Sequence, residues 1–292
     1  MKPAPFRYHA PTTVNEAVAK LAELSPRDGR VLAGGQSLVP MLNFRLLRPS
    51  VLVDINRIGG LAFIDETGSA IRIGALTRHF ALETSPIVAR HLPILSSAMT
   101  HVAHLAIRNR GTIGGSLSHA DPAAELPMLA LLLDAELGVA SASRTRTIVA
   151  RDFFIGAMTV ALAADEIVTE IRLPKLPQHT GWGFEEIARR HGDFALAAAA
   201  ATVTVSDGTI REARIALTGV GPTAVRASAA EALLVGEALG TSLTSRVIGA
   251  VRSSVEPETD LHASSDYRRH LAGVLAGRAV CAAWRRTNAG AA

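Results

Sequence analysis

The sequence has few of the residues that cross-link a chain, stack on nucleic acids or span a membrane. One cysteine, Cys281, occurs among 292 residues, which excludes an internal disulfide and a cysteine-rich metal cluster within this chain. Aromatic residues make up only 4%. Because no basic stripe is interleaved with them, the net charge of +4 indicates a solvated surface and some interface charge rather than nucleic-acid binding.

Long apolar runs are also missing. The most apolar stretch, residues 194–205, is rich in alanine and shorter than the ~18 residues of a membrane-spanning helix, so we expect no membrane span. The chain begins without the apolar core of a secretory signal peptide, because Lys2-Pro3 leads directly into Phe6-Arg7-Tyr8. With a hydrophobic content of 48%, the sequence predicts a cytoplasmic protein with one large or two modest cores.

Motifs for hydrolysis and metal binding are absent or incomplete. No P-loop pattern G-x-x-x-x-G-K-[ST] occurs, and no nucleophile is paired with a base. His101-x-x-His104 and the nearby His119 would suit zinc only with further ligands, and neither H-E-x-x-H nor a cysteine completes the set. We expect these histidines at the surface or packed in a loop, and we predict no catalytic acid or base and no metal in this chain.

A dinucleotide fingerprint is present in outline only. Residues 219–224 fit G-x-G-x-x-A, but they follow predicted antiparallel strands instead of opening a βαβ unit. Pro222 also lacks the N–H that a phosphate would use. The segment is therefore predicted to be a structural turn.

The chain does contain a glycine-rich segment within residues 105–127. A helix is expected to end near Arg108 and Asn109, with Gly111 as its stop signal. The residues that follow are Thr112, Ile113, Gly114, Gly115 and Ser116. Paired glycines leave no Cβ between backbone N–H groups and a bound anion. Asp121-Pro122 is expected to open the next helix. By itself, this segment suits an ordinary turn as well as it suits phosphate binding.

A second segment repeats the pattern nearer the N-terminus. It places paired glycines and a serine between a short apolar strand and a helix-like stretch, and it consists of Leu32, Ala33, Gly34, Gly35, Gln36, Ser37 and Leu38. A diphosphate has two charged groups, so two such segments suit it better than one. Together they favour a diphosphate-containing ligand.

The remaining pattern predicts an α+β chain of two parts. In the first part, a capping box at Thr13-x-x-Glu16 begins a helix among strands at residues 6–8, 30–33 and 51–55. A hairpin follows around Thr67-Gly68, and residues 77–107 are helical with breaks at Pro86 and Pro93.

The second part is separated by a proline-rich linker. Two prolines within residues 173–177 interrupt regular pairing, so we place the boundary after Leu176, giving domains 1–176 and 177–292. A three-stranded antiparallel sheet is predicted from residues 183–188, 195–205 and 210–218. Helices are predicted at residues 225–235, 242–255 and 265–286.

The two glycine segments resemble the paired FAD-binding motifs of a known family. AGGQSLVPMLNFRLLRPSVLVDI and TIGGSLSHADPAAELP are similar to those of the FAD-binding medium subunits of molybdenum hydroxylases, which include the carbon monoxide dehydrogenase flavoprotein and the FAD region of xanthine dehydrogenase. The resemblance continues through FEEIARRHGDFALAAAAATV and LTGVGPTAVRA and covers nearly the whole chain. It implies a vanillyl-alcohol-oxidase (PCMH-type) FAD-binding domain of two α/β subdomains, followed by a domain like the C-terminal domain of the carbon monoxide dehydrogenase flavoprotein.

The resemblance also implies an oxidoreductase component with partners. A large molybdopterin subunit would hydroxylate the substrate, and a small iron–sulfur subunit would deliver electrons to FAD on this chain. FAD would then reduce an external acceptor, in a complex that we expect to be a dimer of heterotrimers. The alternatives are a stand-alone flavoprotein oxidoreductase of the same FAD-binding fold, and an FAD-free scaffold that bridges other subunits.

Site residues follow from the resemblance. The two glycine segments would bind the FAD diphosphate and adjoining groups. Asp121 and Glu125 would lie near the ribose and ribitol hydroxyls, whose protons a carboxylate can accept. Ile167 or Val168 would pack near the isoalloxazine ring, and Phe194 would come close to it.

Two positions depart from patterns within the family. Some members have Tyr where this chain has Phe194, and a phenyl ring cannot form the hydrogen bond of a phenol. Xanthine dehydrogenases have Lys in the region where this chain has Glu185 and Glu186. These differences leave the flavin potential open, and the final electron acceptor could be NAD, oxygen, a quinone or a cytochrome.

Overall fold

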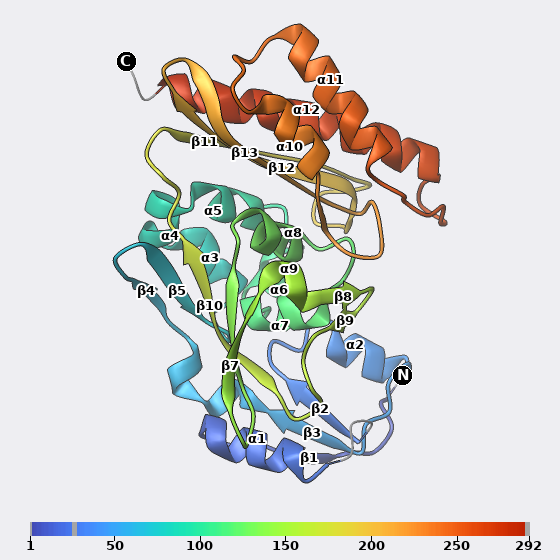
Figure 1. Ribbon diagram of the computed structural model, residues 1–292. Helices are drawn as coiled ribbons and strands as arrows, with labels where there is room; N and C mark the ends of the chain where they lie inside the picture. Colours follow the sequence, from blue (N-terminus) through green and yellow to red (C-terminus); the bar gives the residue numbers. More distant parts are fainter. Residues whose placement is uncertain (1, 25–27, 290–292) are drawn as a thin grey trace.

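The computed structural model describes residues 2–24 and 28–289 and stacks the chain in three levels (Figure 1). The lowest level in that view is a three-stranded parallel sheet in the order β1 (Arg7–His9), β3 (Val51–Asp54), β2 (Gly29–Leu32). The helices α1 (Val14–Ala22) and α2 (Leu38–Asn43) connect these strands. The strands and helices predicted around the first glycine segment are thus present, each within a few residues of its predicted limits.

The middle level is built on a five-stranded antiparallel sheet. Its strands, in spatial order, are β4 (Ile64–Glu66), β5 (Ala70–Gly74), β10 (Ile167–Pro174), β6 (Glu136–Ala140) and β7 (Thr145–Val149). A short hairpin of β8 (Phe154–Gly156) and β9 (Thr159–Val160) lies beside it. Two 3₁₀ turns, η1 (Ile55–Arg57) and η2 (Gly59–Leu61), lead from β3 toward this sheet.

Short helices accompany this sheet. They are α3 (His79–Thr84), α4 (Pro86–His91), α5 (Pro93–Met99), α6 (Leu105–Arg108), α7 (Ile113–His119), α8 (Glu125–Leu132) and α9 (Ala150–Phe153). Pro86 and Pro93 each occupy the first turn of a helix, where a missing N–H is harmless, so the helical pattern is divided at the predicted places.

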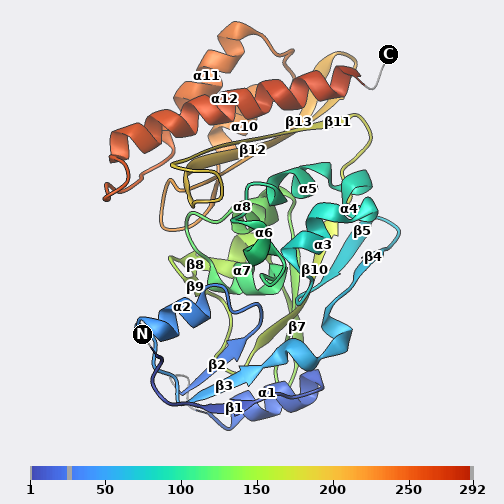
Figure 2. The same cartoon turned by 180° about the vertical axis from the view of Figure 1, so that it is seen from behind.

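The upper level is a four-stranded antiparallel sheet under three helices (Figure 2). The strands are β11 (Thr180–Ala188), β12 (Ala195–Ser206), β13 (Thr209–Thr218) and β14 (Val225–Arg226), and the helices are α10 (Ser228–Leu234), α11 (Thr241–Ser253) and α12 (Ser265–Ala289). The prediction of three strands was wrong. Val225 and Arg226, assigned to a helix from their sequence, pair with Leu217 and Ala216 as a fourth strand.

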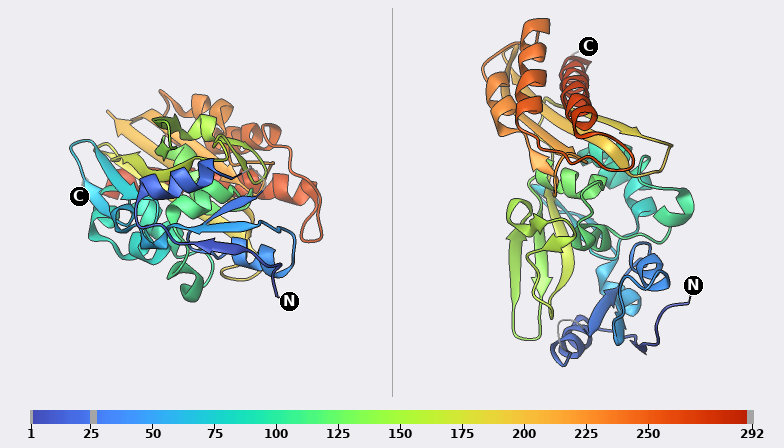
Figure 3. Two further views of the ribbon diagram at one scale, coloured as in Figure 1. Left: turned by 90° about the horizontal axis from the view of Figure 1, so that it is seen from below. Right: turned by 90° about the vertical axis from the view of Figure 1, so that its right-hand side faces the viewer.

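The upper sheet lies between two sets of helices. Figure 3 shows α10, α11 and α12 on its outer side, and α5 and α8 contact its inner side. Gly183 in β11 permits the close approach of α12, because a Cβ there would overlap the carbonyl oxygen of Ala279. Alternate residues Trp182 and Phe184 face the other way and pack against the core of the middle level.

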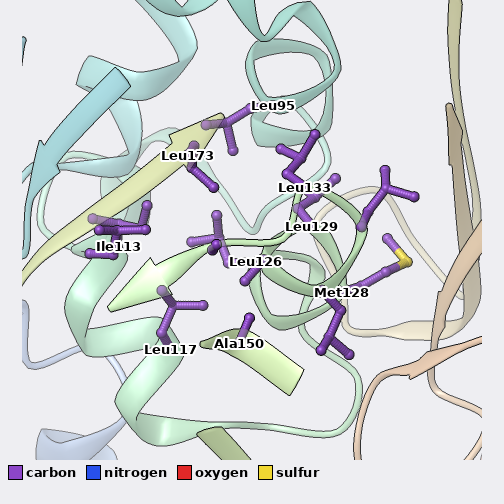
Figure 4. Close-up of a cluster of buried hydrophobic side chains, with 14 of the residues drawn as sticks. Leu95, Ile113, Leu117, Leu126, Met128, Leu129, Leu133, Ala150 and Leu173 are labelled. Carbon is purple, nitrogen blue, oxygen red and sulfur yellow. The ribbon is translucent and has the colours of Figure 1, made fainter. Parts of the chain in front are cut away.

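One buried cluster joins the middle and upper levels. Every residue of α8 is buried, and its leucines pack with Leu95 and Leu173 (Figure 4). Ala198 and Ala200 of β12 belong to the same cluster, so the core extends past the predicted boundary after Leu176. That boundary stays a prediction. The outer ends of the two predicted domains, residues 1 and 292, lie outside the described residues.

None of the described helices is both long and apolar enough to span a membrane. The predicted cytoplasmic location is not tested by the fold.

Candidate functional site

A cleft of about 640 Å³ opens between the lowest level, α7 and a loop of the upper sheet. Clefts of roughly 300 to 1,000 Å³ are typical of small-molecule and cofactor sites. The predicted site residues that line it are Ala33, Gly34, Gly35, Gln36, Ser37, Leu38, Thr112, Gly114, Gly115, Ser116, Glu125, Ile167, Val168 and Phe194. The structure therefore brings the two glycine segments and the more distant positions into one wall.

Three predicted residues lie outside this lining. Ile113 is buried in the core of the middle level. Leu32 ends β2, with its Cδ1 beneath Gly35. The carboxylate of Asp121 is used within its own turn, where Oδ1 accepts the N–H of Ala123 at 2.9 Å.

The first glycine segment is the loop between β2 and α2, as predicted. Gly35 has a φ of +75°, a backbone conformation that residues with a Cβ rarely adopt. Gly34 is needed for a different reason. A Cβ there would overlap the carbonyl oxygen of Arg110 and lie 2.8 Å from the Cα of Gly111. The two glycine segments thus touch each other directly.

The second glycine segment is not a loop. Thr112 is the N-cap of α7, its hydroxyl accepts the N–H of Gly115 at 3.1 Å, and both glycines lie in the first turn. A Cβ on Gly114 would lie 2.6 Å from the Cβ of Ala75, so this glycine allows backbone packing and does not clear space for an anion. The helical assignment was missed because adjacent glycines disfavour helix.

The two segments also differ in the hydrogen bonding of their backbone N–H groups. In α7, the N–H of Gly114 is bonded to Ala75 at 2.9 Å and that of Ser116 to Thr112 at 3.0 Å. In the first segment, the N–H groups of Gly35, Gln36 and Ser37 make no hydrogen bond within the described part of the chain. The first segment therefore offers a run of three unpaired backbone N–H groups to a ligand, whereas the N–H groups of Gly114, Gly115 and Ser116 in the second segment are already bonded within the protein.

Glu125 contributes a buried carboxyl to the cleft wall. It is the first residue of α8, which follows the N-cap Ala124. The helix predicted to open at Asp121-Pro122 therefore begins three to four residues later than expected. Burial, assisted by the charge of Asp121, raises the pKa of Glu125 to about 7. At neutral pH this carboxyl is present in both its protonated and its ionised form.

The upper sheet holds the turn that precedes Glu125. The Thr218 hydroxyl donates to the carbonyl oxygens of Pro122 at 2.7 Å and Ala124 at 3.1 Å, and the Gly219 N–H donates to Pro122 at 2.8 Å. Gly219, the first residue of the G-x-G-x-x-A segment, thus makes a structural contact. None of the described residues of this segment lines the cleft.

A second, partly buried carboxyl, that of Glu186 in β11, lies near Glu125. Its Oε2 atom is buried and has no hydrogen-bond partner among the described residues. Burial, assisted by the charge of Glu125, raises the pKa of Glu186 to about 8. The middle and upper levels thus each place a carboxyl of raised pKa in this region, and a neighbouring negative charge disfavours ionisation of each.

Phe194 closes the cleft from the upper level. It ends the loop between β11 and β12 and is 62% exposed at the mouth. The buried Arg268 of α12 fixes the chain just beyond it by donating to the carbonyl oxygen of Leu196 at 2.6 Å and pairing with Asp260 at 2.8 Å. Hydrogen bonds from the backbone N–H groups of Ala263 and His262 lower the pKa of Asp260 to about 2.

Sequence reasoning missed several residues of the lining. Ser118 and His119 also line the cleft and lie three and four residues after Gly115 on α7, so a helical interpretation of this segment would have indicated them by their spacing. His79 lines it as well, and burial lowers the pKa of its imidazole to about 4. The sequence carries no signal for His79, because the residue that it packs against, Gly111, lies more than thirty residues away along the chain.

His101 and His104 are not on a helical face, since α5 ends at Met99. The ring of His101 instead packs 4.9 Å from that of Phe184, and His104 packs against Gly192. Loop packing was the predicted role, and it is confirmed for these two histidines.

Comparison with known proteins identifies the family. Residues 4–176 match the model of the FAD-binding domain in molybdopterin dehydrogenase, and residues 182–283 match that of the carbon monoxide dehydrogenase flavoprotein C-terminal domain. The chain belongs to the FAD-binding medium subunits of the molybdenum hydroxylases.

Individual members of the medium-subunit family align over the full length. The carbon monoxide dehydrogenase medium chain of Hydrogenophaga pseudoflava is 41% identical, with 98% of this chain and 99% of the relative covered. The alpha subunit of the 6-hydroxypseudooxynicotine dehydrogenase complex of Paenarthrobacter nicotinovorans is 42% identical over 98% of this chain and 97% of its own.

Solved structures agree with this assignment. A carbon monoxide dehydrogenase from Hydrogenophaga pseudoflava, lacking the Mo-pyranopterin moiety of its cofactor, contains a chain that superposes with a TM-score of 0.96 at 43% identity, covering 98% and 99% of the two chains. This medium subunit is therefore the FAD-binding component of an oxidoreductase complex.

Proposed function

We propose that the cleft binds FAD with its diphosphate against the loop between β2 and α2. The observation that carries this proposal is the set of unpaired N–H groups on Gly35, Gln36 and Ser37, which face a cleft of cofactor size. Backbone N–H groups in such a loop are well suited to anionic oxygens. Ser116 and Ser118 of α7 also line this cleft, and their hydroxyls can supply further donors.

The isoalloxazine ring is proposed to lie toward the start of β10. Ile167 and Val168 are buried there and form an apolar wall, and Phe194 covers the mouth from the upper level. A planar apolar ring is stabilised by such walls through burial of its surface.

Glu125 is proposed to bind the hydroxyls of the ribitol or ribose. With a pKa near 7, its carboxyl can both accept a hydrogen bond from one hydroxyl and donate one to another. Asp121, which lies outside the lining, is proposed to act by keeping the turn before Glu125 in shape.

Bound FAD supplies the electron-transfer chemistry, and the protein supplies binding, orientation and exclusion of water. This division of roles agrees with a site that has no nucleophile paired with a base among its described lining residues. In the complex, we propose that electrons arrive from a small iron–sulfur subunit, that a large molybdopterin subunit acts on the substrate, and that the assembly is a dimer of heterotrimers. The support is the full-length similarity to medium subunits of multi-subunit dehydrogenases.

The test is a titration of the apo chain with FAD, followed by flavin fluorescence, for wild type and the variant Ser116→Glu. A carboxylate at this half-buried position repels a diphosphate, so we expect the Kd for FAD to rise at least tenfold (about 1.4 kcal/mol). The matched control is Ser143→Glu, which makes the same change at an exposed turn beside β7. Equal affinity of Ser116→Glu and the control would contradict the site assignment.

Substituting Gly114 is a less informative test. Any side chain there would meet Ala75, so loss of FAD would reflect a disturbed fold.

The stand-alone oxidoreductase alternative predicts a different result. The isolated FAD-loaded chain would then oxidise a small molecule by itself, whereas a medium subunit is inactive until it is combined with its partners.

A further inference from the structure

The two glycine segments are held against each other from behind the cleft by a chain of side-chain hydrogen bonds. The chain begins at the C-terminal end of β3, where the Asp54 Oδ1 atom accepts the side-chain amide of Asn56 at 2.6 Å. The same Asn56 amide donates to the carbonyl oxygen of Ala33 at 2.7 Å, immediately before Gly34. Asn56 is thus anchored to the first glycine segment.

Arg78 continues this chain to the second segment. Its Nη2 atom donates to the Oδ1 atom of Asn56 at 2.7 Å, and its Nη1 atom donates to the carbonyl oxygen of Arg110 at 2.6 Å. That carbonyl oxygen is the atom that a Cβ on Gly34 would overlap. The Arg110 carbonyl oxygen therefore accepts a hydrogen bond from the Arg78 guanidinium and also packs against Gly34.

The partners in this chain come from parts of the sequence that are far apart. Asn56 follows β3, Arg78 precedes α3, and Arg110 follows α6. The side chains of Asn56 and Arg78 do not line the cleft. Their hydrogen bonds instead fix the backbone carbonyl of Ala33, which lines the cleft, and that of Arg110, whose neighbour Gly111 lines it.

We propose that Asn56 and Arg78 are positioning residues for FAD, because they set the spacing between the two glycine segments. This inference rests on the proposed function of the cleft. Preorganised backbone donors bind a ligand more tightly because less conformational entropy is lost on binding. The fork of the guanidinium is essential to this role, since one group must reach two acceptors on different segments.

The experiment measures the Kd for FAD on the full chain for Arg78→Lys, Asn56→Ala and the double variant. Lysine keeps the positive charge but cannot bridge both acceptors, so we expect each single variant to raise the Kd about tenfold (about 1.4 kcal/mol). The double variant is expected to raise it by little more than either single one, because both break the same link. The matched control is Arg72→Lys, which alters an ion pair with Glu170 in the same sheet, away from the cleft.

Thermal unfolding of the apo variants separates positioning from a general structural role. Unchanged affinity for FAD with a lowered Tm would overturn the proposal, as would full retention of affinity in Arg78→Lys, which would show that charge alone matters. Fully additive effects in the double variant would also overturn it. If wild type itself bound no FAD, the proposed function and this inference would fail together, whereas tight wild-type binding with unaffected variants would remove only the inference.

Discussion

Replacing Glu186 by Gln is expected to stabilise the protein at alkaline pH. In the folded state, burial and the charge of Glu125 raise the pKa of Glu186 to about 8, whereas its ordinary value is 4.5. As pH rises from 4.5, the unfolded chain loses this proton first and the folded chain retains it. The free energy of unfolding therefore falls as pH rises through 8, and the stability that this group gives is complete only below pH 4.5.

The magnitude follows from the shift. One pKa unit corresponds to about 1.4 kcal/mol, so the full shift sets an upper limit of about 5 kcal/mol at pH 9. Glu186 is only partly buried, so we expect a gain of about 2 to 3 kcal/mol for Glu186→Gln at pH 9 and a smaller difference at pH 5. Glutamine preserves the shape of the protonated carboxyl and does not ionise.

Urea unfolding of the apo chain at pH 5, 7 and 9 provides the measurement. Glu185→Gln is the matched control, because it removes the same formal charge one residue along β11, on the face toward α12. If both variants gained stability equally at pH 9, net charge and not the buried environment of Glu186 would be responsible. A variant whose free energy of unfolding kept the wild-type dependence on pH would refute the reasoning.

Three further variants test other parts of the structure. Thr112→Val removes the cap that accepts the Gly115 N–H and is expected to cost about 1 kcal/mol in urea unfolding, whereas an unchanged midpoint would show that the cap is not needed. Arg268→Met leaves the Leu196 carbonyl without its buried donor, so the same assay should show a loss of about 1.5 to 3 kcal/mol, and a loss below about 0.5 kcal/mol would contradict this expectation. Phe194→Ala, at an exposed position, should leave the unfolding midpoint nearly unchanged and raise the Kd for FAD about fivefold, and equal affinity would remove the ring from the site.

Much of the fold was predictable because its signals are local. Pro86 and Pro93 divided the helices at the right places, and Thr13 capped α1 by accepting the N–H of Glu16. β14 was not predictable, since two residues carry no periodicity and their pairing depends on β13. The same limit applies to the helix that begins at Thr112, where packing against Ala75 outweighs the low helix propensity of two glycines.

The sequence predicted most of the residues that line the cleft, but it did not predict the contacts that hold them there. The glycine pairs identified the two segments, yet Gly34 and Gly114 are required by neighbouring backbone. The spacing of Ser118 and His119 from Gly115 becomes informative only once the segment is known to be helical. Asn56 and Arg78 gave no signal, because each acts through a tertiary contact. Glu186 was noted only as a departure from a family pattern, and its burial against the middle level was not predictable.

The way in which α8 is held has a consequence for biosynthesis. Its last carbonyl groups, those of Leu131 and Leu132, accept hydrogen bonds from Arg226 at 3.2 Å and Arg214 at 3.4 Å, and its entry turn is fastened by Thr218. Those three side chains leave the ribosome some eighty or more residues after the helix that they complete. The cleft wall is thus finished late in translation, and a chain interrupted after its first 176 residues would have the glycine segments but not the support that keeps Glu125 in place.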